Sequence, residues 1–144
     1  MASLELQGFD SLEDAFKRIA EIPFDVTAEA LDGMAEVAAA KIKAQGESMG
    51  VRDPESDVHI LDKIKRGKAK QTKEGGSESI SFSGTRLRGK TRTRNAEIAF
   101  VNEYGKRGQA ARPFIGLAMT QNAEAIQKPA EKVIGDWIER TFKT

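Results

Sequence analysis

The segment 96–118 constrains the fold of this chain most, because an apolar run, a sharp turn and a helix start follow one another within it. The apolar run, 96–101, brings isoleucine, phenylalanine and valine close together and predicts a β-strand. Gly105 predicts a sharp reversal, since glycine tolerates the positive φ that such a turn needs. Pro113 predicts the first turn of a long C-terminal helix, where proline is well tolerated.

A second strand is predicted over 77–83, where Ile80 and Phe82 alternate with serines. Alternation of this kind is typical of a half-buried antiparallel strand. The simplest arrangement pairs 77–83 with 96–101 in a hairpin. The connection between them, 84–95, is polar and basic, and it forms either a long loop or an extended two-stranded arm.

Helices are predicted on both sides of these strands. A short one starts at Asp10 or Ser11 and ends before Pro23, and a second runs from about residue 25 to a C-terminal cap at Gly46. The C-terminal helix contains Pro129, where we expect a kink or a break, because an interior proline costs about 3 kcal/mol if uncompensated. The apolar stripe of the second helix is predicted to consist of Ala30, Leu31, Met34, Val37, Ala38 and Ile42. We expect Phe114 to be buried against this stripe and against Ile98 and Phe100.

These elements predict an α+β fold. It consists of N-terminal helices, a small antiparallel β-sheet with a long basic hairpin arm, and a long C-terminal helix packed on the sheet. A chain of 144 residues is most simply one domain, 1–144. No apolar run approaches the roughly 20 residues of a membrane helix, and the segment 1–10 lacks the pattern of a signal peptide. We therefore expect a protein that is made and kept in a cytosol and has no membrane partner.

The sequence lacks the constellations that enzymes and metal sites commonly use. It has no cysteine, and its single histidine, His59, lacks the neighbouring ligands that a zinc site needs. It contains neither a phosphate-binding loop nor a dinucleotide fingerprint, and the serines around Phe82 do not form a nucleophile elbow. We therefore predict no catalytic residues, no cofactor, no metal and no enzyme activity.

Two side chains allow both a structural and a functional interpretation. Glu103 stands alone beside an aromatic residue and a glycine, which invites a catalytic hypothesis. The structural interpretation is favoured: Glu103 pairs with Arg112 or caps the following helix, whose N-terminus favours negative charge. Trp137 is interpreted as a helix-packing residue, with a binding hot spot at an assembly interface as the alternative.

Positive charge is concentrated in 63–94. This segment contains eleven Lys and Arg residues and two Glu residues, so its charge is +9 while that of the remaining chain is −8. Three interpretations of this segment are possible. It is a solvated mobile loop, a nucleic-acid-binding segment that neutralises phosphates, or an arm that docks on an acidic surface of a neighbouring copy. The third interpretation is favoured, since only Phe82 offers a ring for base stacking. The predicted assembly or partner contacts are Arg86, Arg88, Lys90, Arg92, Arg94, Trp137, Ile138 and Phe142.

The segment 96–118 also carries a family resemblance. An aliphatic–aromatic lead into Val101-Asn102-Glu103-Tyr104-Gly105, a short loop and then Ala111-Arg112-Pro113-Phe114-Ile115 resembles the small minor-tail or tail-completion proteins of long-tailed, non-contractile phages. In that family an aromatic–V-E-F/Y-G segment precedes a-x-P-F-l-r-x-A. Here Asn102 is an extra residue, and Gly116-Leu117-Ala118 stands where the family often has a charge before the alanine. The matching structural residues are Phe100, Val101, Glu103, Tyr104, Gly105, Arg112, Pro113 and Phe114.

The resemblance implies a structural virion protein that is made in the host bacterial cytoplasm. Such proteins form a homo-oligomeric ring, for which a hexamer is one candidate, at the head-proximal end of the tail, and they mediate head–tail joining. The implied partners are further copies of the chain, tail-tube proteins and head-connector (neck) proteins, with non-specific DNA contact as a further candidate. The alternative function is a cytosolic nucleic-acid-binding module that uses 63–94.

Overall fold

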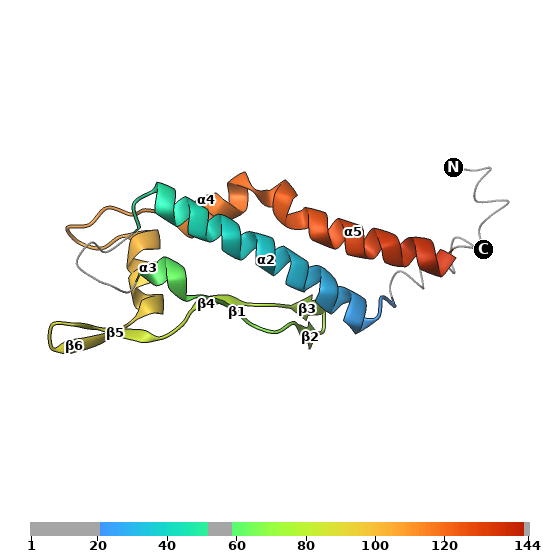
Figure 1. Cartoon of the computed structure of the whole chain (residues 1–144), viewed down its shortest axis with the longest axis horizontal. Helices are drawn as coiled ribbons and strands as arrows, with labels where there is room; N and C mark the ends of the chain where they lie inside the picture. Colours follow the sequence, from blue (N-terminus) through green and yellow to red (C-terminus); the bar gives the residue numbers. More distant parts are fainter. Residues whose placement is uncertain (1–20, 52–58, 143–144) are drawn as a thin grey trace.

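The computed structural model describes residues 21–51 and 59–142, and all statements about the fold concern these residues. Helix α2 (Phe24–Ser48) is the central element, and helix α5 (Ala123–Phe142) lies along one side of it. The strands lie on the other side of α2, so this helix forms the layer between α5 and the strands (Figure 1). The predicted α+β class is confirmed, including the long C-terminal helix. This helix packs on α2, and α2 in turn packs on the strands.

Helix α2 presents mainly small residues to its neighbours. Ala30, Ala38 and Ile42 of the predicted stripe are buried, as are Val26, Ala35 and Gly46. The predicted C-terminal cap at Gly46 is wrong, because the helix continues to Ser48 and Gly50 takes the left-handed turn with φ of 72°. Gly46 is instead required by packing: a Cβ on it would lie 2.5 Å from Leu61 Cδ2.

The C-terminal helical region is divided at Asn122 into α4 (Phe114–Gln121) and α5. The predicted break at Pro129 is therefore wrong, since α5 is continuous through this residue. Asn122 leaves helical geometry with φ of −122° and ψ of 23°, and its Nδ2 donates to the Ala118 carbonyl at 2.9 Å. Asparagine side chains compete in this way for backbone hydrogen bonds, which explains the interruption.

In the described part of the chain the strands form three antiparallel pairs. β1 (Ile64–Arg66) pairs with β4 (Ile80–Phe82), and β2 (Lys70–Thr72) pairs with β3 (Gly75–Ser77). β5 (Thr85–Arg88) pairs with β6 (Thr91–Arg94), so the connection 84–95 is the two-stranded arm and not a loop. Ile80 and Phe82 do share the half-buried face, but the predicted strand 77–83 is divided and its partner is β1.

The strand predicted for 96–101 is wrong, because these residues belong to helix α3 (Asn95–Tyr104). The buried residues of α3 are Asn95, Ile98, Ala99 and Asn102, which recur at the three- and four-residue spacing of a helix face. A strand would have buried Ile98 and Phe100 together, whereas Phe100 is 62% exposed. The predicted hairpin between 77–83 and 96–101 therefore does not form.

The core lies where one end of α2 meets α3, α4 and the 3-10 helix η1 (Ile60–Lys63). Phe114 is fully buried at its centre, and the ring of Phe82 meets it edge-on with centroids 6.0 Å apart. The prediction that Phe114 packs against Ile98 and helix α2 is confirmed, whereas its predicted contact with Phe100 is wrong. The remaining buried members of this cluster are Ile42, Val51, Ile60, Leu61, Ala99 and Ala118.

The helix predicted between Asp10 and Pro23 lies outside the described residues. In the part that is described, every helix is too short or too polar to cross a membrane.

Candidate functional site

Glu103 holds the N-terminus of helix α4. Its Oε2 accepts a hydrogen bond from the Ile115 amide at 2.8 Å, and its Oε1 accepts one from the Gly116 amide at 2.9 Å. The first amides of a helix have no partner within the helix, and a carboxylate there also meets the positive end of the helix dipole. The prediction that Glu103 caps the following helix is confirmed, and the cap explains its position without a catalytic role.

Arg112 has a different partner from the predicted one. Its Nη1 donates to the Gly50 carbonyl at 2.9 Å, which ties the loop before α4 to the end of α2. Gly105 makes the predicted reversal with φ of 78°, and a Cβ there would lie 2.9 Å from the Ala111 amide nitrogen. The cap, the reversal and the buried Phe114 thus join α3 and α4 into one rigid unit.

Helix α3 displays two aromatic rings to solvent. Phe100 is 62% exposed and Tyr104 is 69% exposed, and their ring centroids are 4.7 Å apart. Residues four apart on a helix are neighbours, so the rings contact each other but still leave a large apolar area in water. Sequence reasoning placed Phe100 in the core and Tyr104 at a turn. Helical spacing would have revealed the pair.

The β5–β6 hairpin projects from the end of the molecule near α3 (Figure 1). Lys90, Arg92 and Arg94 are exposed on it, as predicted for a basic arm. Arg92 Nη1 donates to Thr85 Oγ1 at 2.8 Å, and Arg94 Nε lies 3.0 Å from Glu97 Oε1. Arg86 was predicted to be an assembly contact on this arm, but it is only 7% exposed, so it is buried within the fold. Arg88 lies on β5 opposite Thr91.

The other predicted contact residues lie elsewhere. Trp137, Ile138 and Phe142 are half-buried on α5, and the rings of Trp137 and Phe142 meet edge-on with centroids 6.5 Å apart. Helix α5 ends at the side of the molecule opposite the hairpin (Figure 1). The structure therefore separates the two groups of predicted contacts instead of forming one surface from them. Half-burial of Trp137 favours its helix-packing interpretation.

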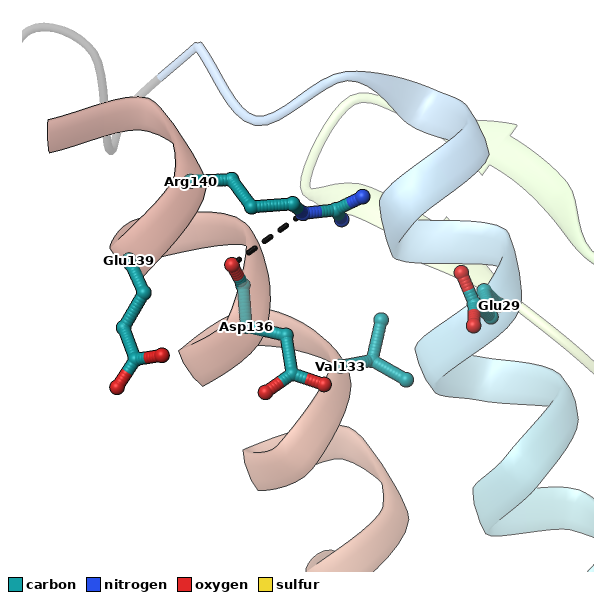
Figure 2. A pocket seen from close by; sticks show the side chains of 5 residues that line it. All are labelled: Glu29, Val133, Asp136, Glu139 and Arg140. Atoms are coloured by element: carbon teal, nitrogen blue, oxygen red, sulfur yellow. Dashed lines mark hydrogen bonds between the residues drawn. The ribbon is translucent and has the colours of Figure 1, made fainter. Parts of the chain in front are cut away.

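A groove of about 380 Å³ lies between α2 and α5 near that opposite end. Val133, Asp136 and Arg140 extend from α5 toward Glu29 of α2 (Figure 2), and Glu139 completes the lining. Arg140 Nε donates to the Asp136 carbonyl at 3.4 Å. Sequence reasoning did not single out these residues. The available signal was the first half of α2, where 24–36 contains four acidic residues and no basic one.

An electrostatically coupled cluster joins the strands to α2. Arg66 Nη1 of β1 lies 3.5 Å from Asp32 Oδ1 of α2 and donates to the Asp32 carbonyl at 3.2 Å. Burial raises the pKa of Glu78, which lies between β3 and β4, and the charge of Asp32 raises it further, while Arg66 opposes the shift. In the described chain no three His, Cys, Asp or Glu side chains are grouped so that they could hold a metal ion.

No family model matches the sequence, and comparisons with curated proteins and with solved structures give no match either. The features that bear on function are therefore the geometry of the chain itself and the resemblance carried by residues 100–114. Within that segment, the geometry offers an exposed aromatic pair on a rigidly held helix, next to a basic hairpin.

Proposed function

We propose that this chain is a structural virion protein similar to phage tail-completion proteins, which forms a ring at the head-proximal end of a tail and mediates head–tail joining. The observation that carries the proposal is the exposed ring pair of Phe100 and Tyr104. Contiguous apolar patches on a protein surface mark sites of association, and buried aromatic anchors supply much of the binding free energy there. A protein that acts by assembly needs such an anchor.

The support of helix α3 suits this role. Its inner face is fixed by the buried residues Ile98 and Ala99, and Asn95 Nδ2 donates to the Ser83 carbonyl at 2.8 Å. Its end is fixed by the bonds from Glu103 to helix α4. An anchor held in place before binding loses little conformational freedom on association, which favours affinity. Of the residues that carry the family resemblance, Glu103 thus fixes the end of the helix on which Phe100 and Tyr104 are displayed.

One observation favours the second candidate, a nucleic-acid-binding module. The exposed aromatic pair lies in sequence between the basic hairpin 84–94 and two basic residues, Lys106 and Arg107. The side chains of Lys106 and Arg107 are also exposed. Surfaces that bind single-stranded nucleic acid combine exposed rings, on which bases stack, with cations that neutralise phosphates. The experiment must therefore separate protein assembly from nucleic-acid binding.

The test compares F100S/Y104S with the control M119S, which alters another exposed apolar side chain, on α4. The gene for each variant replaces the natural gene in the phage or prophage that encodes this chain. We expect F100S/Y104S to yield filled heads and separate tails by electron microscopy, while M119S yields joined particles. Both variants should keep the thermal midpoint of the wild type, since these side chains are exposed.

Retention on columns of single-stranded and duplex DNA at increasing salt provides the second measurement. Joined particles from F100S/Y104S, together with loss of its retention on single-stranded DNA, would contradict the assembly proposal and support the nucleic-acid candidate. Unjoined heads and tails with unchanged retention would support the assembly proposal.

A further inference from the structure

We infer that the β5–β6 hairpin of one copy docks into the groove between α2 and α5 of the next copy, so that opposite ends of neighbouring copies associate. This inference deepens the proposed function, on which it rests for its biological setting, by naming the contact between neighbouring subunits. Its two surfaces lie at opposite ends of the molecule (Figure 1). Helix α2 has 25 residues, which corresponds to a length of about 37 Å, so the hairpin does not reach the groove of its own chain.

The charges of the two ends are complementary. The hairpin segment 84–94 contains five basic residues and no acidic one. The first half of α2, 24–36, contains four acidic residues and no basic one. The exposed lysines Lys68, Lys70 and Lys73 lie on the strand side of α2, so the acidic residues on the side toward α5 form the surface that attracts the hairpin of another copy.

The outer face of the hairpin is defined by its register. Leu87 lies directly opposite Arg92, and Thr85 lies directly opposite Arg94, so these four residues share one face. Leu87 is 65% exposed on this face. Arg86 lies on the opposite face of the hairpin and is buried. The opposite face is therefore the one that packs toward the rest of the protein. The hairpin thus presents an exposed leucine flanked by two arginines to solvent.

The groove offers the matching chemistry. Val133 supplies an apolar contact for a side chain such as Leu87, and Glu29 and Asp136 supply carboxylates beside it, while Glu139 lines the groove farther from α2. Arg140 is the one cation of the lining against three carboxylates, so the groove is net negative. Figure 2 shows Glu29 and Asp136 on opposite sides of Val133, from α2 and α5 respectively. A side chain such as Leu87 can enter between them, with the neighbouring arginines of the hairpin close to the two carboxylates.

The two surfaces differ, and this determines the kind of assembly. A contact between unlike surfaces uses the hairpin of each copy on one side and its groove on the other. Such a heterologous contact continues from copy to copy, and it closes into a ring when the rotation between neighbours allows closure. The contact therefore suits a ring and not an isolated two-fold dimer.

The first experiment is a charge exchange between the two surfaces. The hairpin variant is K90E/R92E, and the groove variant is E29K/D136K; all four side chains are exposed. Sedimentation velocity at low salt should show multimers for the wild type and monomers for each variant alone. An equimolar mixture of the two variants should regain the multimer, because each reversed surface then meets its complement.

Matched controls change the same charges outside the two surfaces. K68E/K73E alters exposed lysines near β2, and E124K/E131K alters exposed glutamates of α5 outside the groove. Both controls should associate like the wild type. A wild-type chain that stays monomeric at low salt, or multimers in both reversed variants, would overturn the inference.

A cysteine pair maps the contact directly, because the natural chain has no cysteine. Mixing L87C with V133C under oxidising conditions should give a covalent dimer, whereas L87C mixed with M119C should not. Loss of self-association in K90E/R92E with normal head–tail joining would contradict the proposed function but not this contact. A monomeric chain whose F100S/Y104S variant still blocks joining would contradict this contact but not the proposed function.

Discussion

Gly33 and Pro129 meet where helices α2 and α5 cross: a Cβ placed on Gly33 would lie 2.8 Å from the Cβ of Pro129. Glycine and proline are the two poorest helix formers, yet each lies in the interior of a helix here. The missing side chain of the one makes room for the ring of the other. Contact between the helices offsets part of the cost that each residue imposes on its own helix.

We predict that Gly33→Ala destabilises the protein, although alanine is favoured over glycine in a helix by about 1 kcal/mol. The added methyl group would overlap with Pro129 and force the helices apart, and overpacking of this kind typically costs about 1–3 kcal/mol. Chemical denaturation would measure the change. Gly135→Ala is the matched control, because a Cβ there meets nothing within 4 Å, and it should stabilise the protein. Equal effects of the two substitutions would contradict the packing argument.

We predict that Glu103→Ala lowers the free energy of unfolding by about 1–2 kcal/mol, the cost of losing a helix cap. Two amides at the start of α4 lose their acceptors in this variant. Glu103→Gln should cost less, since its amide oxygen still accepts one of the two bonds. The control Glu131→Ala removes an exposed carboxylate of α5 and should be nearly neutral. Thermal melts of the three variants provide the test, and a neutral Glu103→Ala would sink the prediction.

Phe100 and Phe114 should respond differently to truncation, because one is exposed and the other is buried. Phe114 is fully buried, so Phe114→Ala should cost about 3–5 kcal/mol, enough to unfold many small proteins. Phe100 is 62% exposed, so Phe100→Ala should change the free energy of unfolding by less than about 0.5 kcal/mol. Denaturant midpoints for both variants test the placement of α3. A large loss of unfolding free energy for Phe100→Ala would support a β-strand over 96–101 in place of helix α3.

The pH dependence of stability should carry a contribution from Glu78. Its pKa in the folded protein is raised above 4.5 by burial and by Asp32 of α2, against the opposing effect of Arg66 of β1. The folded state therefore binds more protons than the unfolded state just above pH 4.5, and this contribution to stability grows as the pH falls through the raised pKa. At neutral pH the charged Glu78 opposes folding.

Glu78→Gln isolates this contribution from those of the other titrating groups. We expect the variant to gain stability relative to the wild type at pH 7 and to lose that advantage as the pH approaches 4.5. Urea denaturation of both proteins across this range gives the difference directly. A difference that stays constant, or that grows on acidification, would show that the pKa of Glu78 is not raised.

Local chemistry determined several features that the sequence alone predicted. The small apolar residues of α2 recur at helical spacing, so the helix could be placed before any contact was known. Gly105 tolerates a positive φ and Pro113 fixes its own φ, and the reversal and the start of α4 follow from these local properties. Glu103 was expected to pair with Arg112 or to cap the following helix, because negative charge is favoured at a helix N-terminus, and the structure shows the cap.

Only the tertiary structure decided the conformation of 95–104. Ile98, Phe100 and Val101 fit a strand and a helix equally well, and the choice depends on which side of the segment meets the core. Pro129 shows the same limit, since contact with Gly33 allows the proline to remain in a helix. The groove between Glu29 and Asp136 exists because α2 and α5 pack together. Packing between residues this far apart in the chain has no signature in local spacing, so only the folded molecule reveals it.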